Sequence, residues 1–481
     1  MKYDVIIIGG GIVGTAIARA LSVYKLRIAL LEKEEELAFG VSKSNSGIIH
    51  PGTQNHPRSL KGKLCVQGNI LTRKIALDLG VEFKEVGELI VACNNHEVNR
   101  LLELKQEAHV LGVPRLEIVD RNWLREHEPN ISKDIIAALY APTAGVLSPY
   151  RMVYALAENA VQNGVKSIMG TEVKKISFRK KTHKKLKPKF KIYTSTETFQ
   201  TTCVINAAGL NADVISRMVG IKNFTIMPRK GEEYILDKKK EYLTNHLIFP
   251  LPSKTSKGIL IIKTADGNPM IGPTAEEISD KQDLSTSDQG FHACVSAARK
   301  MIPSIRAEDI IAYFAGLRPV AGNDFIIRHE DAVPGFVNVA GIQSPGLTAA
   351  PAIALLVCDL LKNNGLSLMK KSRFNTYRSK ITHLLDIPLS QTDQVIKKDR
   401  TYGDIVCRCE MVSAKEIRDA VGRGARTLDG IKFRTRAQAG RCHGGFCTTR
   451  IMRILSHEIH RPLLKITKRG SGSEIVKGER T

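Results

Sequence analysis

The chain contains 481 residues, of which 43% are hydrophobic and 25% are charged. This composition excludes a disordered, collagenous or disulfide-dense protein, and the length predicts about three domains, or one large domain and a small one. Aromatic residues make up only 5%, which argues against a nucleic-acid platform built on stacked rings. The net charge of +24 is compatible with an anionic membrane surface, an acidic partner or nucleic acid.

The first elements in chain order form a βαβ unit. Residues 3–8 predict a buried strand, a glycine-rich turn and an alanine-rich helix follow, and residues 27–31 predict a second strand. Such a unit predicts a parallel sheet. Further helices are expected at 61–79, 97–111, 150–163 and 288–302, and further strands at 88–92, 203–207, 232–236, 258–263 and 336–340. The alternation predicts an α/β fold with an inserted second sheet.

Much of the positive charge is concentrated in one segment. Residues 174–191 contain ten Lys or Arg and no acidic residue, between two strand-like runs at 170–177 and 190–194. We expect a solvated hairpin tip, with a docking surface as the alternative.

The composition changes again near residues 380–400. Residues 387–394 show weak periodicity and contain turn-forming residues, and residues 400–469 contain 16 Lys or Arg but only 6 Asp or Glu. We therefore expect a linker at 381–399, a separate basic module at 400–469 and a flexible tail at 470–481.

Neither a membrane span nor a leader is expected. The apolar run 349–361 is interrupted by Asp359 and is too short to cross about 30 Å of hydrocarbon. The apolar residues at the N-terminus are better explained by the glycine turn than by a signal peptide. We expect a cytoplasmic protein, with a peripheral position at the cytoplasmic face of the membrane as the alternative.

The turn after the first strand is a dinucleotide-binding fingerprint. Gly9, Gly11 and Gly14 allow a tight turn, close approach of a pyrophosphate and close helix–strand packing, and the helix N-terminus faces the phosphates. Glu32, at the end of the second strand, can accept hydrogen bonds from ribose hydroxyls and disfavours a 2′-phosphate. The nucleotide contacts are therefore expected from Gly9, Gly11, Ile12, Val13, Gly14 and Glu32.

Several other segments resemble the D-amino-acid oxidase-like FAD family. They are the strand and turn at 204–210 and the Ser-Asn-Ser-Gly-Ile-Ile-His stretch that ends at His50. The segments at 50–53, 59–65, 231–234, 316–319 and 341–348 are similar to the glycerol-3-phosphate and L-2-hydroxyglutarate dehydrogenase branches of that family. We find no second fingerprint for NAD.

The resemblance covers residues 1–380 and implies a fold and a cofactor. It implies a Rossmann-like FAD-binding domain with an inserted antiparallel-sheet substrate domain, the insert lying at roughly 85–145 and 225–310. FAD would also be contacted by Ser42, Asn45, Ser46, Gly47, Val173, Ala208, Gly209, Gly341, Gln343, Gly346, Leu347 and Thr348.

Oxidation of an alcohol through a flavin requires a base, an anchor for the substrate and stabilisation of the reduced ring. The glycine-bearing loop 341–348 opens a helix and could present amides to a developing anion, although it could also be a plain helix cap. His50 is the candidate base or donor.

The substrate anchor is expected to be cationic. In the resembling enzymes Arg318 contacts the substrate anion, and we expect it on a rigid turn at a strand end, before Pro319. Arg229 or Lys230 could add a second cation, and Tyr234 is a further substrate-binding candidate. Two cations would favour a phosphate dianion, whereas one suffices for a carboxylate.

Four of the nine cysteines are clustered in the basic module. Cys407-x-Cys409 is followed after 32 residues by Cys442-x4-Cys447. Four thiolates suit either zinc or a [2Fe–2S] cluster, and a Cys-x-Cys pair is unusual for zinc. The pattern resembles the bacterioferritin-associated ferredoxin-like [2Fe–2S] domain, so we expect Cys407, Cys409, Cys442 and Cys447 to hold that cluster, with zinc as the alternative.

Together these features predict an FAD-dependent dehydrogenase. We expect oxidation of sn-glycerol 3-phosphate to dihydroxyacetone phosphate, with an L-2-hydroxy acid or an amino acid as the alternative substrate. Electrons would leave through the cluster to a protein subunit or a quinone, and the basic module could contact an acidic partner or an anionic membrane. A nucleic-acid or iron-carrier protein with a vestigial nucleotide fold is supported only by the charge, and no nucleic-acid partner is expected.

Overall fold

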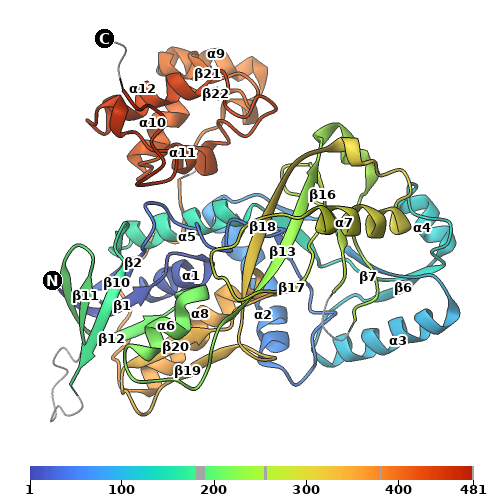
Figure 1. Cartoon of the computed structure of the whole chain (residues 1–481), viewed down its shortest axis with the longest axis horizontal. Coiled ribbons are helices and arrows are strands. Elements are labelled where there is room, and N and C mark those ends of the chain that lie inside the picture. Colours follow the sequence, from blue (N-terminus) through green and yellow to red (C-terminus); the bar gives the residue numbers. More distant parts are fainter. Residues whose placement is uncertain (180–189, 254–256, 380, 479–481) are drawn as a thin grey trace.

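The computed structural model describes residues 1–179, 190–253, 257–379 and 381–478. Its first large sheet has eight strands (Figure 1). The parallel core is β12-β1-β2-β9, with Ile6 aligned to both Ala29 and Val204. The strands are β1 Lys2–Ile8, β2 Ile28–Leu31, β9 Lys166–Ile168, β10 Val173–Phe178, β11 Phe190–Thr194, β12 Thr198–Asn206, β19 Ile326–His329 and β20 Phe336–Ala340.

Helices cover one face of this sheet and form the largest core. They are α1 Ile12–Leu21, α2 Leu60–Leu79, α5 Pro149–Gln162 and α8 Gly346–Asn363, and α6 Ala212–Arg217 packs on the other face. Helix α8 is longer than the sequence indicates, and by length and composition it could cross a membrane. Its buried side chains, however, pack against α1 and α2, as expected of a core helix.

The second large sheet has nine strands and is antiparallel except where β14 runs parallel to β5. Helices α3 Asn95–Val110, α4 Arg121–His127 and α7 Asp288–Met301 cover it, and the short strands β3 Ile48–Ile49, β4 Phe83–Glu85 and β8 Gly145–Leu147 form a further small sheet. The nine strands are β5 Glu88–Ala92, β6 Glu117–Asp120, β7 Ala137–Ala141, β13 Met227–Leu236, β14 Leu247–Phe249, β15 Leu260–Lys263, β16 Pro269–Gly272, β17 Glu276–Glu277 and β18 Ile310–Val320.

The strands that flank the basic segment form a hairpin, in which Phe178 of β10 is aligned with Phe190 of β11. The predicted tip at 180–189 lies outside the described residues.

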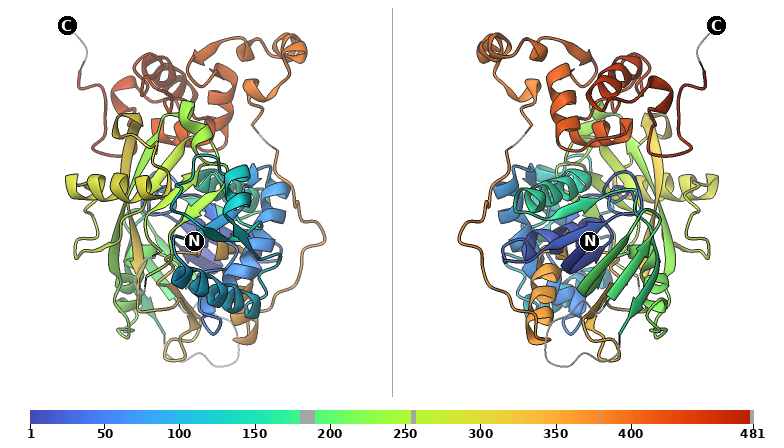
Figure 2. Two further views of the ribbon diagram at one scale, coloured as in Figure 1. Left: turned by 90° about the vertical axis from the view of Figure 1, so that its right-hand side faces the viewer. Right: turned by 90° about the vertical axis from the view of Figure 1, so that its left-hand side faces the viewer.

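After α8 the chain runs along the outside of the domain of the first large sheet as a strap, residues 366–379 (Figure 2). The amide of Lys371 donates to the carbonyl of Val23 at 2.9 Å. Where the sequence indicates only a linker, the structure has helix α9, Leu389–Lys398. None of its residues is buried, so the helix leaves no apolar stripe in the sequence.

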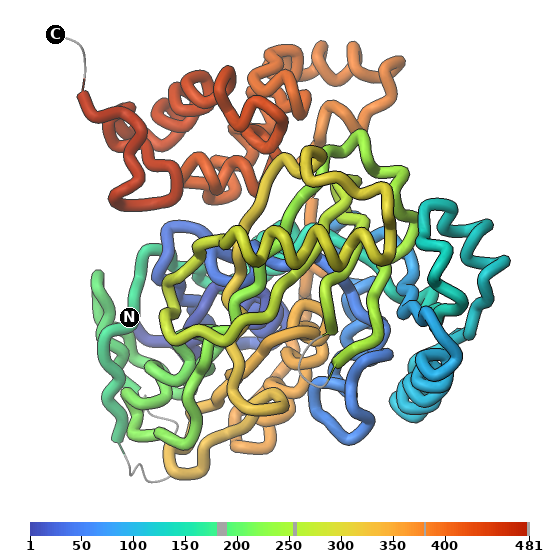
Figure 3. Tube along the Cα trace, turned by 45° about the vertical axis from the view of Figure 1, so that its right-hand side comes forward, coloured from blue at the N-terminus to red at the C-terminus, as the bar shows by residue number. Residues whose placement is uncertain are grey.

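The C-terminal module has its own apolar core, which includes Ile417, Leu428, Ile431, Ile451 and Leu455. Its elements are β21 Ile405–Cys407, β22 Val412–Ser413, α10 Ala414–Gly422, α11 Leu428–Thr435 and α12 Thr448–Glu458. The expected flexible tail differs in the structure, since Thr467 and Glu474 form an antiparallel bridge. Figure 3 shows the module, in red, lying over both large domains.

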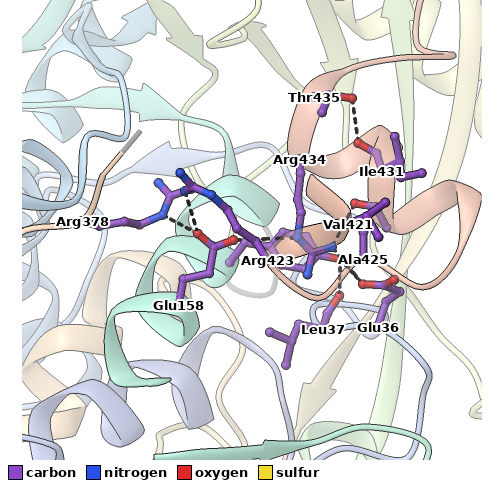
Figure 4. Close-up of polar contacts among 12 residues, drawn as sticks. Glu36, Leu37, Glu158, Arg378, Val421, Arg423, Ala425, Ile431, Arg434 and Thr435 are labelled. Carbon is purple, nitrogen blue, oxygen red and sulfur yellow. Dashed lines mark hydrogen bonds and ion pairs between the residues drawn. The ribbon is translucent and has the colours of Figure 1, made fainter. Parts of the chain in front are cut away.

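Buried ion pairs fix the module against the domain of the first large sheet (Figure 4). Glu36 accepts a hydrogen bond from Arg434 Nη1 at 3.0 Å and another from the backbone amide of Arg426 at 2.9 Å. The Arg434 guanidinium also lies 3.9 Å from the ring centre of Tyr154, on α5. Glu158, one turn further along α5, receives Arg378 of the strap and Arg423 of the module. The position of the module against this domain therefore depends on several charged side chains that are shielded from solvent.

Candidate functional site

The turn between β1 and α1 is a cradle that only glycines can form. Gly9 has a φ of +114°, and a Cβ there would lie 2.3 Å from the carbonyl oxygen of Ala207. A Cβ at Gly14 would lie 1.9 Å from the carbonyl of Gly9. At Gly11 a Cβ would meet only the Ser42 hydroxyl, at 3.0 Å, so this position remains open toward a ligand. The residues therefore fit the pyrophosphate of a dinucleotide.

Glu32 lies at the expected position after β2. Its carboxylate accepts hydrogen bonds from the amides of Gly10, at 2.6 Å, and Glu34, at 3.0 Å. Burial raises the pKa of Glu32. The segment that leads into Val173 passes beside it, because the amide of Thr171 donates to the Glu32 carbonyl at 2.8 Å. This arrangement places Glu32 and Val173, two of the predicted cofactor contacts, at one edge of the sheet.

The segment that ends at His50 is held in place by its own side chains. Ser42 Oγ accepts from the Ile12 amide at 2.9 Å, at the N-terminus of α1. Asn45 donates to the Ser42 carbonyl at 2.9 Å and accepts from the Gly47 amide at 3.0 Å. The Asn45 side chain is thus engaged by the loop, and Asn45 supports the cofactor loop through Ser46 and Gly47 rather than offering a free side chain.

The loop before α8 meets the same segment. Thr348 Oγ1 accepts from the His50 amide at 2.9 Å, and Ser344 Oγ lies 3.5 Å from His50 Nε2. Ala208 and Gly209 follow the end of β12 at Asn206 and lie next to Gly9. The structure therefore brings the predicted flavin-site segments together around the cradle, among them Gly341, Gln343, Gly346 and Leu347 of this loop.

His50 is 8% exposed and lies beside a buried carboxylate. Its Nδ1 is 3.7 Å from Glu88 Oε2, and the other Glu88 oxygen accepts from the Thr53 hydroxyl. Burial and the positive charge of Lys257 lower the pKa of His50 to about 4, although Glu88 acts in the opposite direction. The imidazole is therefore neutral near pH 7 and can accept a proton. Our sequence analysis missed Glu88, although an acidic residue at the head of a buried strand was a visible signal.

Arg318 lies inside a strand, which corrects the expected turn. Strand β18 continues to Val320, and Arg318 is aligned with Arg229 of β13. Its Nη2 donates to the Thr274 carbonyl at 2.5 Å, and burial lowers its pKa despite the charge of Glu233 nearby. A Cβ at Gly316 would lie 2.3 Å from the carbonyl of Ser44. The strand face that carries Arg318 is therefore turned toward the cofactor loop.

Two of the predicted substrate-binding residues lie on the opposite strand face. Side chains alternate along a strand, so Lys230 and Tyr234 are separated from Arg229 and Glu233. Lys230 Nζ pairs with Asp283 at 3.0 Å, and the Tyr234 hydroxyl donates to Glu232 at 2.6 Å. This placement argues against the expectation that Lys230 and Tyr234 contact the substrate together with Arg318. Arg229 has the right orientation but pairs with Glu277 at 2.6 Å.

A second cation comes from a residue that our sequence analysis did not select. Lys257 interacts electrostatically with Glu88 and with Arg318, and burial lowers its pKa. It therefore joins His50 and Arg318 in one electrostatic cluster. Glu233 completes the cluster: burial raises its pKa to about 7, and its Oε2 has no hydrogen-bond partner within the described part of the chain. Lys257 stands in no motif that singles it out, and Glu233 lies within the family-like segment 231–234, from which our sequence analysis selected only Tyr234.

The four clustered cysteines approach one another in the module. Cys409 Sγ lies 3.6 Å from Cys442 Sγ, and the Cys447 thiol interacts with that of Cys407. Within the described ranges, no three His, Cys, Asp or Glu side chains converge as closely as a single metal ion requires. Backbone amides of Gly444 and Phe446 lower the pKa of Cys442, which favours the thiolate that a metal needs. Two pairs of thiols fit a binuclear cluster better than one tetrahedral ion.

Comparison with known proteins agrees with this construction. A family model described as FAD dependent oxidoreductase matches residues 4–360, and one described as BFD-like [2Fe-2S] binding domain matches residues 405–457. A glycerol 3-phosphate dehydrogenase of Caloramator mitchellensis is 42% identical over 479 residues, which are 99% of this chain and 98% of that protein. The human mitochondrial L-2-hydroxyglutarate dehydrogenase is 30% identical over 414 residues, covering 74% of this chain and 88% of that protein.

The solved structures give the same result. The dithionite-reduced L-α-glycerophosphate oxidase from Mycoplasma pneumoniae, with FAD bound, matches with a TM-score of 0.73 and 31% identity, over 78% of this chain and 98% of that chain. The fold and the glycine cradle thus define a flavin-dependent oxidoreductase. The chain belongs to the FAD-dependent oxidoreductase family, which confirms the expected fold class and the expected class of enzyme.

Proposed function

We propose that this enzyme oxidises sn-glycerol 3-phosphate to dihydroxyacetone phosphate. The observation that carries the proposal is Arg318, which lies on the strand face whose Gly316 approaches the carbonyl of Ser44, with Lys257 as a second cation that interacts electrostatically with it. Two cations suit a phosphate dianion, and a guanidinium can hold two of its oxygens at once. Similarity to a glycerol 3-phosphate dehydrogenase over almost the whole chain supports the same substrate.

The chain's own residues divide the work as follows. Arg318 and Lys257 bind the phosphate and thereby orient the carbon that carries the hydroxyl group. His50 takes the hydroxyl proton at Nε2, while Glu88 faces Nδ1 and holds the ring in the matching tautomer. The amides at the start of α8 stabilise negative charge that develops nearby. Bound FAD supplies the acceptor for the hydride.

Electrons leave the enzyme through the C-terminal module in this proposal. Cys407, Cys409, Cys442 and Cys447 would hold a [2Fe–2S] cluster, which supplies one-electron transfer to a protein or quinone acceptor. A dehydrogenase of this kind would work in the cytoplasm or at the cytoplasmic face of the membrane. Zinc at the four cysteines is the alternative, and metal analysis of protein purified without air distinguishes the two.

The substrate is tested by anaerobic flavin reduction. Glycerol 3-phosphate is expected to bleach the visible flavin absorbance, whereas glycerol, which lacks the phosphate, is not. L-2-Hydroxyglutarate is the second candidate, because the human enzyme is 30% identical and one of the two cations would bind a carboxylate. Faster bleaching by L-2-hydroxyglutarate or by an amino acid than by glycerol 3-phosphate would overturn the proposal.

A further inference from the structure

The positive charge of the module is not neutralised within the module. All six acidic residues between 400 and 469 already form ion pairs, namely Asp404, Glu410, Glu416, Asp419, Asp429 and Glu458. Four arginines pair with acidic residues of the other domains: Arg423, Arg434, Arg436 and Arg441 pair with Glu158, Glu36, Asp266 and Asp237. Others have no ion pair among the described residues, including Arg400, Arg408, Arg453, Arg461, Lys465 and Arg469.

Part of this charge surrounds the cysteine site. Arg408 is exposed between Cys407 and Cys409, and Cys409 is itself exposed. Helix α12, which begins directly after Cys447, carries Arg450 and Arg453, both exposed and three residues apart, so they lie on one side of the helix. Arg450 pairs with Asp404, whereas Arg453 has no ion pair among the described residues. Arg450 Nη1 also donates to the carbonyl of Ile405 at 2.8 Å, which ties α12 to the strand that leads into Cys407.

An exposed aromatic ring lies next to Cys447 in the sequence, two residues before α12 begins. Phe446, between Cys442 and Cys447, is 85% exposed, although the adjacent Cys447 is only 2% exposed. Burial of such a large apolar side chain is favourable, and this fold does not gain that contribution. Aromatic rings and arginines are the residues that most often anchor protein interfaces. We define the rim as Arg408, Phe446, Arg450 and Arg453.

We propose that the rim is the docking surface for a small acidic electron-carrier protein. The proposal rests on the proposed function, in which electrons leave through the cluster. Oxidation of one hydroxyl group to a carbonyl releases two electrons and two protons. The reduced cluster passes one electron to each of two oxidised carriers in turn, so each carrier is reduced by one electron. Opposite charge speeds the encounter, and Phe446 supplies an apolar contact next to the electron exit.

The alternative occupant, an anionic membrane, fits this surface less well. The apolar residues of α12, such as Ile451, Met452 and Leu455, are buried inside the module. The helix therefore has no free apolar face to insert between lipids, and stable membrane binding needs such a face or a second anchor. A protein partner needs only the Phe446 ring, the arginines of the rim and the exposed Cys409.

The test uses the holoenzyme, with cytochrome b5 as an acidic one-electron probe and cytochrome c as a basic one. With glycerol 3-phosphate as donor, cytochrome b5 reduction should be the faster and should fall as salt rises. Arg453→Glu should slow cytochrome b5 reduction about tenfold at low salt. Phe446→Ala should slow it as well, with the electron paramagnetic resonance signal of the cluster unchanged. Lys222→Glu, an equal charge change at an exposed position of the flavin-binding domain, should leave the rate unchanged.

Two readouts separate the possible failures. Substrate bleaching of the flavin is followed in every sample, and its absence in the native enzyme would refute the proposed function rather than the docking surface. Normal bleaching with equal cytochrome b5 rates for the native enzyme and Arg453→Glu would overturn the docking proposal. So would binding to phosphatidylserine vesicles that Arg453→Glu abolishes while cytochrome b5 reduction is unaffected, because that result assigns the rim to a membrane.

Discussion

Glu36 and Arg434 are 398 residues apart in sequence, yet their side chains form an ion pair of 3.0 Å in which both are almost fully buried. Glu36 belongs to the loop that follows Glu32, the predicted ribose-binding residue, and Arg434 belongs to helix α11, which faces α5. A charge left alone at such a position is costly, whereas an apolar pair of similar volume is often tolerated.

The first prediction therefore concerns this pair. Glu36→Leu or Arg434→Leu alone should destabilise the docked module by about 3–5 kcal/mol, because each removes the nearest opposite charge from a buried ionic side chain. The double substitution should cost less than the sum of the two. Thermal unfolding and protease cleavage in the strap measure the effect. Additive single effects would show that the pair is not coupled.

The second prediction concerns the pH dependence of flavin reduction. With a pKa of about 4, His50 stays neutral above that pH, so the rate should be flat near pH 7 and should fall only below about pH 5. Glu88→Gln should move this limb to lower pH, because the carboxylate raises the pKa of His50. It should also slow reduction, though less than His50→Ala, which should cost about 10²-fold if His50 is the base.

Glu117→Gln, which changes an exposed carboxyl of the same sheet, is the matched control for Glu88→Gln. Stopped-flow reduction with glycerol 3-phosphate between pH 4 and pH 8 (roughly the range that histidine titration spans) is the measurement. An acid limb that stays in place in Glu88→Gln would mean that Glu88 does not act through His50.

The same histidine should affect stability. Its folded pKa lies below the ordinary value of about 6.5, so the unfolded chain binds a proton that the native protein refuses. The free energy of unfolding should therefore fall as the pH drops from about 6.5 toward 4. The stabilisation that neutral His50 contributes should be fully present above about pH 6.5. Urea unfolding at pH 7 and pH 5 should show a smaller pH effect for His50→Gln. An equal effect in both proteins would exclude His50 as the source.

The fourth prediction concerns the substrate anchor. Lys257→Met and Arg318→Lys should raise the KM for glycerol 3-phosphate and lower turnover while flavin is retained, because methionine lacks the charge and lysine lacks the bidentate fork. Lys230→Met removes a lysine from the other face of β13 and should change neither constant by much. If Lys230→Met had the larger effect, the assignment of strand faces would be wrong.

The fifth prediction separates substrate oxidation from electron exit. Cys442→Ser should lose the iron signal, yet glycerol 3-phosphate should still bleach the flavin, because the flavin and substrate residues all precede residue 380. Turnover with a protein acceptor should collapse, whereas an artificial dye can take electrons from the flavin directly. Zinc bound to the four thiols, with no iron in protein kept from air, would refute the electron route.

The sequence predicts the nucleotide site well because backbone geometry dictates its residues. Gly9 and Gly14 have no space for a side chain, so that requirement is written into the residue type. The residues of the substrate site are harder to predict from the sequence. Which face of β13 carries Lys230 depends on the pairing register with β18, and Lys257 reaches Arg318 only through folding of distant segments. The helix α9 was missed because it buries nothing.

The Glu36–Arg434 contact also imposes an order on folding during synthesis of the chain. Ribosomes add roughly 5–20 residues each second, so the interval between synthesis of Glu36 and synthesis of Arg434 is on the order of tens of seconds. Until then Glu36 and Glu158 have no arginine from the module to neutralise them, while the segments of the nucleotide cradle are already complete at Gly209. The nascent chain can therefore bind its cofactor before the C-terminal module packs against the loop that contains Glu36.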